Sequence, residues 1–393
     1  MMRKIIHLDL DAFFCAVEEL RDPSLRGKAF AVGGRPESRG VVASCSYPAR
    51  RVGVRSAMPM SQALRLCPEL IITPARHGEY RTMSRQVMAR LRAMTELVEQ
   101  ISIDEAFLDV SERFEQGETL ARSLQATIRE ELALPCSLGV ATNKLVAKIA
   151  NNTGKAQARG SGPPNAICVV PPGEEAAFLA PLPAEELWGV GPKTAARLAE
   201  LGIKTIGDIA HWPEADLAKR FGKNGVELSR HARGLDDRPI VTQHERKSIS
   251  QETTFERDVA DGAHLRRTLQ EQAADVARVL RAKRLSGATI KLKLRWSDFT
   301  TLTRQTTLPQ PTDDAHLIAS AGTQLFEREW AGQPVRLIGI GISGFQTGLQ
   351  QPTLWDQPDE RSERLDAALQ SLRARFGDHS IRRGLDLDDE DIL

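Results

Sequence analysis

The stretch Ile5-Ile6-His7-Leu8-Asp9-Leu10-Asp11-Ala12-Phe13-Phe14 places carboxylates inside an apolar run near the start of the chain. A second stretch, Ile101-Ser102-Ile103-Asp104-Glu105-Ala106-Phe107-Leu108-Asp109-Val110, repeats this arrangement further along. Such runs predict buried strands, where ionised carboxylates are costly unless they are paired or bind a cation. Oxygen donors that stay charged favour magnesium, and with it phosphate chemistry. The alternative is that these acids cap helices or lie on surface turns, but two such runs within one predicted sheet favour a metal site.

Apolar spacing predicts alternating strands and helices over the first 153 residues. We expect strands at 3–10 and 136–141, a hairpin at 98–110 with Asp104 and Glu105 at or near its turn, and helices at 12–20, 79–97, 120–132 and 143–153, the last ending at Gly154. This order resembles a split βαβ, ferredoxin-like sheet, which would bring Asp9 beside Asp104 and Glu105. Residues 23–75 would be an inserted module with short strands at 29–32 and 40–44 and a helix at 59–66.

The character of the chain changes after a break rich in Gly and Pro at residues 160–164. Residues 174–235 are expected to be helical, and residues 236–248 are polar and aperiodic, which is typical of a linker. Residues 249–345 predict a small α+β unit. Its expected elements are strands at 288–296 and 337–343 and helices at 264–284 and 312–329.

Composition places the chain among ordinary soluble proteins, with 41% hydrophobic and 27% charged residues and a net charge of +1. Residues 246–345 carry 15 Lys and Arg against 11 Asp and Glu, whereas residues 346–393 carry 6 against 11, so the tail is acidic. The five cysteines are odd in number, irregularly spaced and without a CxxC pair, which favours reduced thiols over disulfides or zinc. Without a signal-length or membrane-spanning apolar run, we expect a cytoplasmic protein that does not bind membranes.

Several motifs, taken together, resemble the Y-family DNA polymerases, and in particular the bacterial DNA polymerase IV group. They are HLDLDAFF (7–14), SYPAR (46–50), SIDEAFLDV (102–110), SLGVATNKLVAKIA (137–150) and GVGPKTAARL (189–198), and they occur in unbroken order. The resemblance covers roughly residues 2–345. It implies a right-hand polymerase of α+β multidomain fold that copies past damaged template bases.

The implied domains follow the predicted elements. We expect a ferredoxin-like palm at 1–22 and 76–170, small fingers at 23–75, a helical thumb with a helix-hairpin-helix at 171–238, a linker at 239–248, an α+β little finger at 249–345 and an acidic tail at 346–393. No segment remains for a proofreading exonuclease, so we expect low fidelity.

The resemblance assigns roles to residues around the carboxylates. Asp9, Asp104 and Glu105, with the backbone carbonyl of Leu10, match the ligands of two magnesium ions, which would activate the primer 3′-hydroxyl and neutralise the leaving pyrophosphate. Asp11 and Asp109 lie outside the matched set, and we expect them to be structural. Phe14 matches the steric gate that excludes ribonucleotides, although its spacing alone favours core packing. Triphosphate contacts match Tyr47, Arg50 and Lys155, with the register of Lys155 left open by the long 156–164 segment.

Further matches concern DNA and the sliding clamp. The helix-hairpin-helix residues Gly189, Gly191, Lys193 and Thr194 would hold a DNA phosphate at a helix start, where the alternative is a plain helical hairpin. Lys291, Lys293 and Arg295 alternate on one strand and predict a phosphate-tracking stripe rather than a merely solvated face. Gln351, Leu354 and Trp355 in the QPTLW stretch resemble a clamp-binding peptide.

The leading interpretation is a monomeric DNA polymerase acting on primer-template DNA and deoxynucleoside triphosphates. One alternative is a catalytically inactive adaptor that binds DNA and the clamp, but such adaptors lose the carboxylates and this chain keeps all three. A helix-hairpin-helix repair nuclease is a second alternative, which would not explain Phe14 or the pair Tyr47 and Arg50.

Overall fold

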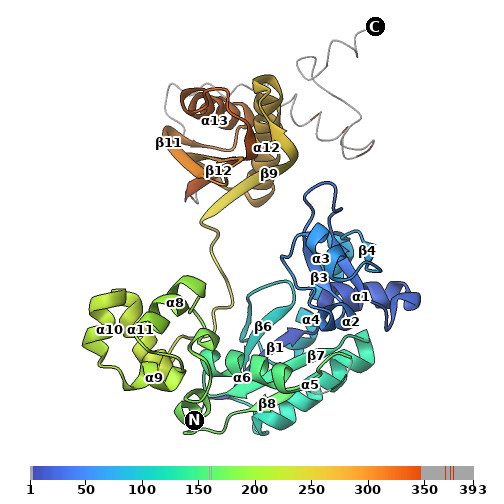
Figure 1. Ribbon diagram of the computed structural model, residues 1–393, viewed down its shortest axis with the longest axis vertical. Coiled ribbons are helices and arrows are strands. Elements are labelled where there is room, and N and C mark those ends of the chain that lie inside the picture. The colour runs from blue at the N-terminus through green and yellow to red at the C-terminus, as the bar shows by residue number, and fades with distance from the viewer. Residues whose placement is uncertain are drawn as a thin grey trace.

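The structure is a computed structural model that describes residues 3–158, 160, 162–346, 368, 372 and 375. Within these residues the chain forms three separate sheets and one helical segment, arranged along its length as Figure 1 shows. None of the helices in this described part is long and apolar enough to cross a membrane.

The first sheet has five strands in the order β5-β6-β1-β7-β8. Its strands are β1 (Ile5–Leu10), β5 (Val98–Gln100), β6 (Glu105–Asp109), β7 (Cys136–Ala141) and β8 (Ile167–Val169). Neighbours run antiparallel except for β8, which adds parallel to β7. The strands β7-β1-β6-β5 have the predicted ferredoxin-like arrangement, so this expectation is confirmed. The short edge strand β8 was not predicted.

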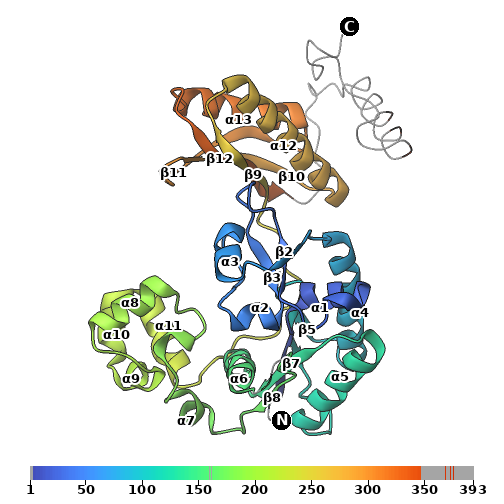
Figure 2. The ribbon, with the colours of Figure 1, turned by 45° about the vertical axis from the view of Figure 1, so that its right-hand side comes forward.

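Helices cover both faces of this sheet (Figure 2). Ile6, Leu8 and Leu10 share a core with α4 (His77–Met94) and α5 (Gly117–Leu132), whereas Ile5 shares one with α6 (Lys144–Gln157). Because side chains alternate along a strand, His7 and Asp9 face the same side as Ile5. A Cβ at Gly139 would lie 1.9 Å from the Ala147 carbonyl oxygen. Glycine there allows α6 to approach the strand backbone that carries the acids.

The helix predicted at 143–153 was expected to end at Gly154, and this is wrong, because α6 continues to Gln157. A Cβ built on Gly154 would come within 3.0 Å of the Cys168 Cβ on β8. The glycine therefore serves close packing between helix and edge strand rather than termination. This continuation adds the turn that carries Lys155.

Residues 23–75, the segment expected to be inserted, contain a separate sheet of the order β3-β2-β4. Its elements are η1 (Pro23–Leu25), β2 (Phe30–Gly33), β3 (Val42–Cys45), α2 (Tyr47–Arg51), α3 (Met60–Leu66) and β4 (Ile71–Thr73). Strand β4 was not predicted. The preceding helix, α1 (Phe13–Arg21), joins the module to the first sheet and packs in the core with α4.

The helical segment contains α7 (Glu175–Leu179), η2 (Ala184–Glu186), α8 (Pro192–Glu200), α9 (Ile206–His211), α10 (Glu214–Phe221) and α11 (Lys223–Ala232). Its core continues into that of α6, and Trp188 packs against Phe107 of β6 with ring centroids 5.7 Å apart. The chain leaving α11 docks on the start of α6. There Asn143 Nδ2 donates to the Gly234 carbonyl oxygen at 2.9 Å, and Asp236 accepts from the Leu145 N–H at 3.1 Å.

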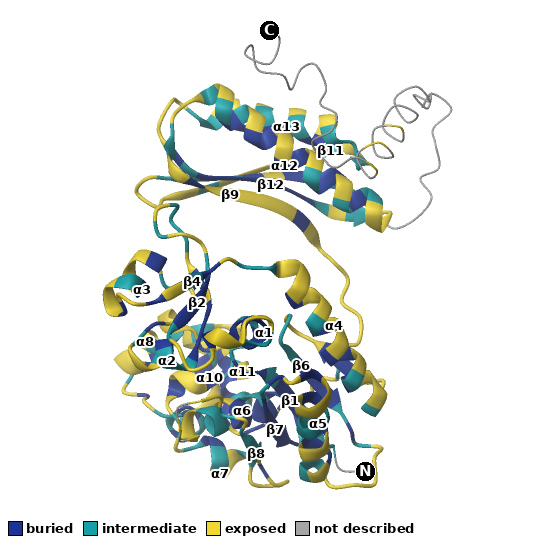
Figure 3. Ribbon diagram, turned by 90° about the vertical axis from the view of Figure 1, so that its right-hand side faces the viewer, coloured by how far each residue is buried: buried dark blue, intermediate teal, exposed yellow. Residues whose placement is uncertain are grey.

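The last sheet has the order β11-β10-β12-β9, all antiparallel. Its elements are β9 (Ser248–Val259), α12 (Gly262–Lys283), β10 (Ser286–Trp296), β11 (Thr301–Thr312), α13 (Ala315–Glu329) and β12 (Val335–Gln346). The helices cover one face, while β9 is largely exposed (Figure 3).

Two expectations for this last unit are corrected. The strands β9 and β11 were not predicted, and the helix expected at 312–329 begins only at Ala315. Thr312 ends β11, and the Asp314 side chain caps the helix by accepting from the N–H groups of His316 and Leu317.

Arg39 links the first half of the chain to the last sheet. Arg39, in the connection between β2 and β3, donates to Asp258 of β9 at 2.7 Å and to the Phe255 carbonyl oxygen at 3.2 Å. The inserted module and the last sheet therefore lie next to each other, as Figure 1 shows.

Candidate active site

Two of the predicted carboxylates stand directly opposite each other. Asp9, near the end of β1, is the register partner of Glu105, at the start of β6. The backbone N–H of Leu10 donates to the Asp104 carbonyl oxygen at 3.0 Å, so Asp104 continues the same corner of the sheet. The antiparallel pairing of β1 and β6 therefore brings together segments that are far apart in sequence.

Helix α6 lays a polar stripe across these strands. Lys144, Lys148, Asn151 and Lys155 are spaced by four, three and four residues, which puts them on one helix face. Lys148 Nζ contacts Glu105 Oε2 at 2.8 Å, and Lys155 Nζ lies 2.6 Å from Asp9 Oδ1 and 3.3 Å from Asp11 Oδ1. Each acid of the pair therefore contacts one lysine. Our sequence reasoning missed Lys148. The signal that could have revealed it is its spacing of four residues from Lys144 and seven from Lys155, which puts the three lysines on one helix face.

Burial and charge act differently on the two acids. Burial raises the pKa of Asp9 to about 7, against the opposing charge and hydrogen bond of Lys155. Burial also opposes the ionisation of Glu105, but hydrogen bonding and charge from Lys148 outweigh it and lower the pKa of that carboxyl. Glu105 is therefore ionised at neutral pH, whereas full ionisation of Asp9 requires more positive charge than Lys155 supplies. A partly buried, oxygen-only pair of this kind fits a divalent cation, which would take the place of the proton.

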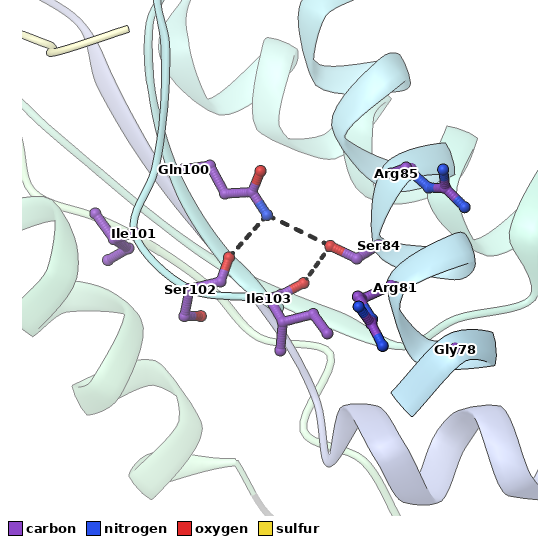
Figure 4. A pocket seen from close by; sticks show the side chains of 8 residues that line it. All are labelled: Gly78, Arg81, Ser84, Arg85, Gln100, Ile101, Ser102 and Ile103. Carbon is purple, nitrogen blue, oxygen red and sulfur yellow. Dashed lines mark hydrogen bonds between the residues drawn. The ribbon is translucent and has the colours of Figure 1, made fainter. Parts of the chain in front are cut away.

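The Asp104 side chain bonds to Ser102. Its Oδ1 accepts from Ser102 Oγ at 2.5 Å, within the turn between β5 and β6. Ser84 of α4 donates to the Ile103 carbonyl oxygen and Gln100 Nε2 to that of Ser102, and these bonds hold the turn beside a hollow of about 700 Å³ (Figure 4). Among the described residues, no three His, Cys, Asp or Glu side chains are close enough together to hold a metal ion. Asp9 and Glu105 thus lie opposite each other, and Asp104 lies in the adjoining turn with its side chain bonded to Ser102.

His7 is a buried neighbour of the pair that our sequence reasoning did not single out. Burial, followed by the charges of Lys148 and Lys155, holds the pKa of His7 well below its usual value, so the ring is neutral. Asn151 Nδ2 lies 2.9 Å from Nδ1 and also donates to the Ser137 carbonyl oxygen, so Nδ1 accepts and Nε2 carries the proton. That Nε2 lies 3.9 Å from Glu105 Oε2.

The two remaining acids are satisfied by protein groups. Asp11 accepts from Ser137 Oγ at 3.0 and 2.9 Å and from the Asn165 N–H at 3.1 Å. Asp109 accepts from the Ser111 N–H at 2.9 Å, at the far end of β6. These contacts support the structural roles expected for both residues.

The predicted gate and triphosphate residues lie around the same corner. Phe14 is partly buried on α1, with its ring stacked on Tyr80 at a centroid distance of 4.2 Å. The guanidinium of Arg50 lies over the ring of Tyr47, 4.9 Å from its centroid, and both residues belong to α2. Burial, followed by the charge of Asp11, raises the pKa of Tyr47. The phenol therefore stays protonated and able to donate a hydrogen bond.

The predicted DNA contacts lie on two other elements. Gly189 has φ of +101°, and Gly191 precedes α8, whose first turn contains Lys193 and Thr194 and has no side-chain cap. Lys291, Lys293 and Arg295 alternate on β10 with Leu292 and Leu294 of the core, so the stripe lies on the open face of the last sheet. Lys293 already pairs with Glu252 at 2.6 Å. The clamp-peptide residues Gln351, Leu354 and Trp355 lie outside the described residues.

Comparison with known proteins matches each part of this architecture. Two descriptions of the impB/mucB/samB family match, the main one at residues 8–152 and its C-terminal domain at 246–354, and the thumb domain of DNA polymerase-iota matches at 185–236. The chain belongs to the Y-family of DNA polymerases. Similar proteins from other organisms are named DNA polymerase IV. That from Halorhodospira halophila is 43% identical over 90% of this chain and 98% of the relative, and that from Desulfatibacillum aliphaticivorans is 40% identical over 96% and 95%.

Solved structures agree with this membership. The Y-family DNA polymerase chimera Dbh-Dpo4(243-245)-Dbh is 28% identical with a TM-score of 0.77, and the match covers 88% of this chain and all of the chimera. An insertion ternary complex of Dbh DNA polymerase has the same identity and coverage with a TM-score of 0.61. The predicted family and fold class of this Y-family polymerase are therefore confirmed.

Proposed function

We propose that this Y-family polymerase adds deoxynucleotides to a primer 3′ end under the direction of a template, without proofreading, and that it bypasses damaged template bases. The observation that carries the proposal is the pairing of Asp9 and Glu105 across two strands, with Lys155 in contact with Asp9 and Tyr47 near both Asp9 and Asp11. The relatives named DNA polymerase IV and the Dbh complexes support the same reaction class.

The carboxylates would serve as ligands and not as nucleophiles. Asp9, Glu105 and the Leu10 carbonyl would hold divalent cations, and Asp104 would join them by turning from Ser102. Two magnesium ions, when bound, would activate the primer 3′-hydroxyl and neutralise charge on the leaving pyrophosphate. Lys155 would exchange its contact with Asp9 for a triphosphate oxygen, and Tyr47 and Arg50 would also donate hydrogen bonds to the triphosphate.

Other parts of the chain would hold the substrates. The loop before α8 would hold a DNA phosphate through its backbone N–H groups, and the stripe on β10 would follow the DNA backbone. Phe14 would lie against the sugar and exclude a 2′-hydroxyl. We further propose that the polymerase works in the cytoplasm as a monomer and binds a sliding clamp through residues 351–355.

The test is primer extension by the full chain with magnesium on an undamaged template and on one with an abasic site. Glu105→Gln should reduce extension by about 100-fold or more, because a neutral amide cannot balance cationic charge. Asp109→Asn is the matched control, since Asp109 lies on the same strand but pairs with Ser111, and it should keep extension. A wild-type protein that binds primer-template without extending it would support the inactive adaptor instead.

A further inference from the structure

Helices α1 and α4 contact each other beside Phe14, the predicted steric gate, and each helix contributes two residues to the contact. Phe14 and Glu18 lie four residues apart on α1, and Arg76 and Tyr80 lie four apart at the start of α4. Each pair therefore occupies one face of its helix, and the two faces contact each other. The two helices lie next to each other in Figure 2.

The contacts between these faces are short and meet at a buried carboxylate. Tyr80 Oη donates to Glu18 Oε1 at 2.5 Å, and Arg76 Nη1 donates to Glu18 Oε2 at 2.6 Å. Glu18 is 1% exposed and Tyr80 0%. The ring of Tyr80 in turn stacks on that of Phe14 with an interplanar angle of 13°. One buried carboxylate thus holds the tyrosine that backs the gate ring.

These bonds restrict the motion of the tyrosine more than packing alone would. A buried carboxylate that loses a donor is left with an unmet hydrogen-bonding requirement, so the phenol and the guanidinium are both held in place. With its oxygen fixed, the Tyr80 ring cannot tilt without breaking the bond to Glu18. Phe14 therefore rests on a rigid surface, as a group that discriminates by shape requires.

We infer that Glu18 is a positioning residue for sugar selection, acting through Tyr80 to hold Phe14 against the incoming nucleotide. This inference rests on the proposed role of Phe14 as the steric gate. Glu18 itself has no role in chemistry, because its two oxygens are occupied by Tyr80 and Arg76. A 2′-hydroxyl would be excluded by a ring that cannot retreat, and admitted more readily when the ring behind it loosens.

The test measures kcat/KM for one deoxynucleotide and for its ribonucleotide counterpart on the same primer-template, with the full chain. Tyr80→Phe keeps the ring and its packing but removes the bond to Glu18, and Glu18→Gln weakens the same bond from the other side. Each should lower the deoxynucleotide-to-ribonucleotide ratio about three- to tenfold, mainly through a higher kcat/KM for the ribonucleotide. Both nucleotides are measured on one preparation, so a smaller folded fraction cancels in the ratio.

Two further variants separate the possible failures. Glu19→Gln changes the adjacent carboxylate on α1, which makes no bond to Tyr80 or Arg76, and it should leave the ratio unchanged. Phe14→Ala should lower the ratio further than Tyr80→Phe does. If Phe14→Ala lowers it while Tyr80→Phe and Glu18→Gln do not, the positioning role is wrong and the gate remains. If Phe14→Ala also leaves the ratio intact, the gate assignment itself fails.

Discussion

A buried ion pair fixes the chain that leaves the thumb to the edge of the palm, and its removal gives a quantitative prediction. Glu99, on edge strand β5, contacts Lys144 Nζ at 2.8 Å and accepts from the Val241 N–H at 2.9 Å, both through Oε2. Lys144 Nζ also donates to the Pro239 carbonyl oxygen at 2.8 Å. The side chains of the pair are only 8% and 5% exposed. Part of the segment expected to be a linker is thus attached to the palm.

The structure suggests how large the effect of Lys144→Met should be. This change leaves the buried Glu99 without its ammonium partner, while His244 at 3.8 Å and the charge of Arg238 remain nearby. Breaking a buried pair from one side costs about 3–5 kcal/mol. Replacing both partners, in Glu99→Leu with Lys144→Met, removes the uncompensated charge and leaves only partly buried backbone groups, at a cost of about 1–2 kcal/mol. The double variant should therefore be more stable than Lys144→Met alone.

Native-state hydrogen exchange is the appropriate assay, because a chain with several domains does not unfold in one step. The opening free energy of the α6 amides should fall by about 3 kcal/mol or more in Lys144→Met and recover in part in the double variant. The Val241 amide should lose protection in Glu99→Leu, since its acceptor is gone. A loss of under about 1 kcal/mol in Lys144→Met, or a double variant at the sum of the singles, would refute the reasoning.

Three further predictions concern the site and the tail. Asp104→Ala should still bind primer-template but not extend it, as gel shift and primer extension would show; extension near the wild-type rate would contradict the metal assignment. Without metal, the folded state holds a proton on Asp9 up to about pH 7, whereas an unfolded aspartate loses it near pH 4, so this residue makes stability fall as pH rises between these values. In EDTA, the melting temperature of Asp9→Asn minus that of the wild type should therefore be larger at pH 8 than at pH 5. The same difference at both pH values would contradict the raised pKa of Asp9. Truncation after residue 346 should keep distributive synthesis and remove stimulation by the clamp; equal stimulation of both forms would rule out the tether.

Elements with strong periodicity could be predicted from the sequence, and weakly patterned strands could not. β9 buries only Ile249 and Phe255 firmly, since one face is open and the strand lies at the sheet edge. β11 lies at the opposite edge, is mostly exposed and contains Pro309, which an edge strand tolerates. Neither segment carries the alternating apolar signal on which such predictions depend.

The contacts around the site depended on elements that are distant in sequence. Sequence motifs pointed to Asp9 and Glu105, but their direct pairing follows from the register of β1 against β6. The lysine–carboxylate contacts exist only because Gly139 allows α6 to cross close to the sheet. Glu18 gave no signal of its own, because its partners Arg76 and Tyr80 lie about sixty residues later on another helix.

The amino-acid sequence by itself determined the family, the ferredoxin-like order of the palm and the residue types available for phosphate chemistry, because these follow from local patterns and short motifs. Only the tertiary structure decided which charges meet: Lys155 with Asp9, Lys148 with Glu105, and Glu99 with Lys144. The physical reason is that the energy of a charge depends on the distance to its partners and on burial, and both are set by how helices pack on the sheet.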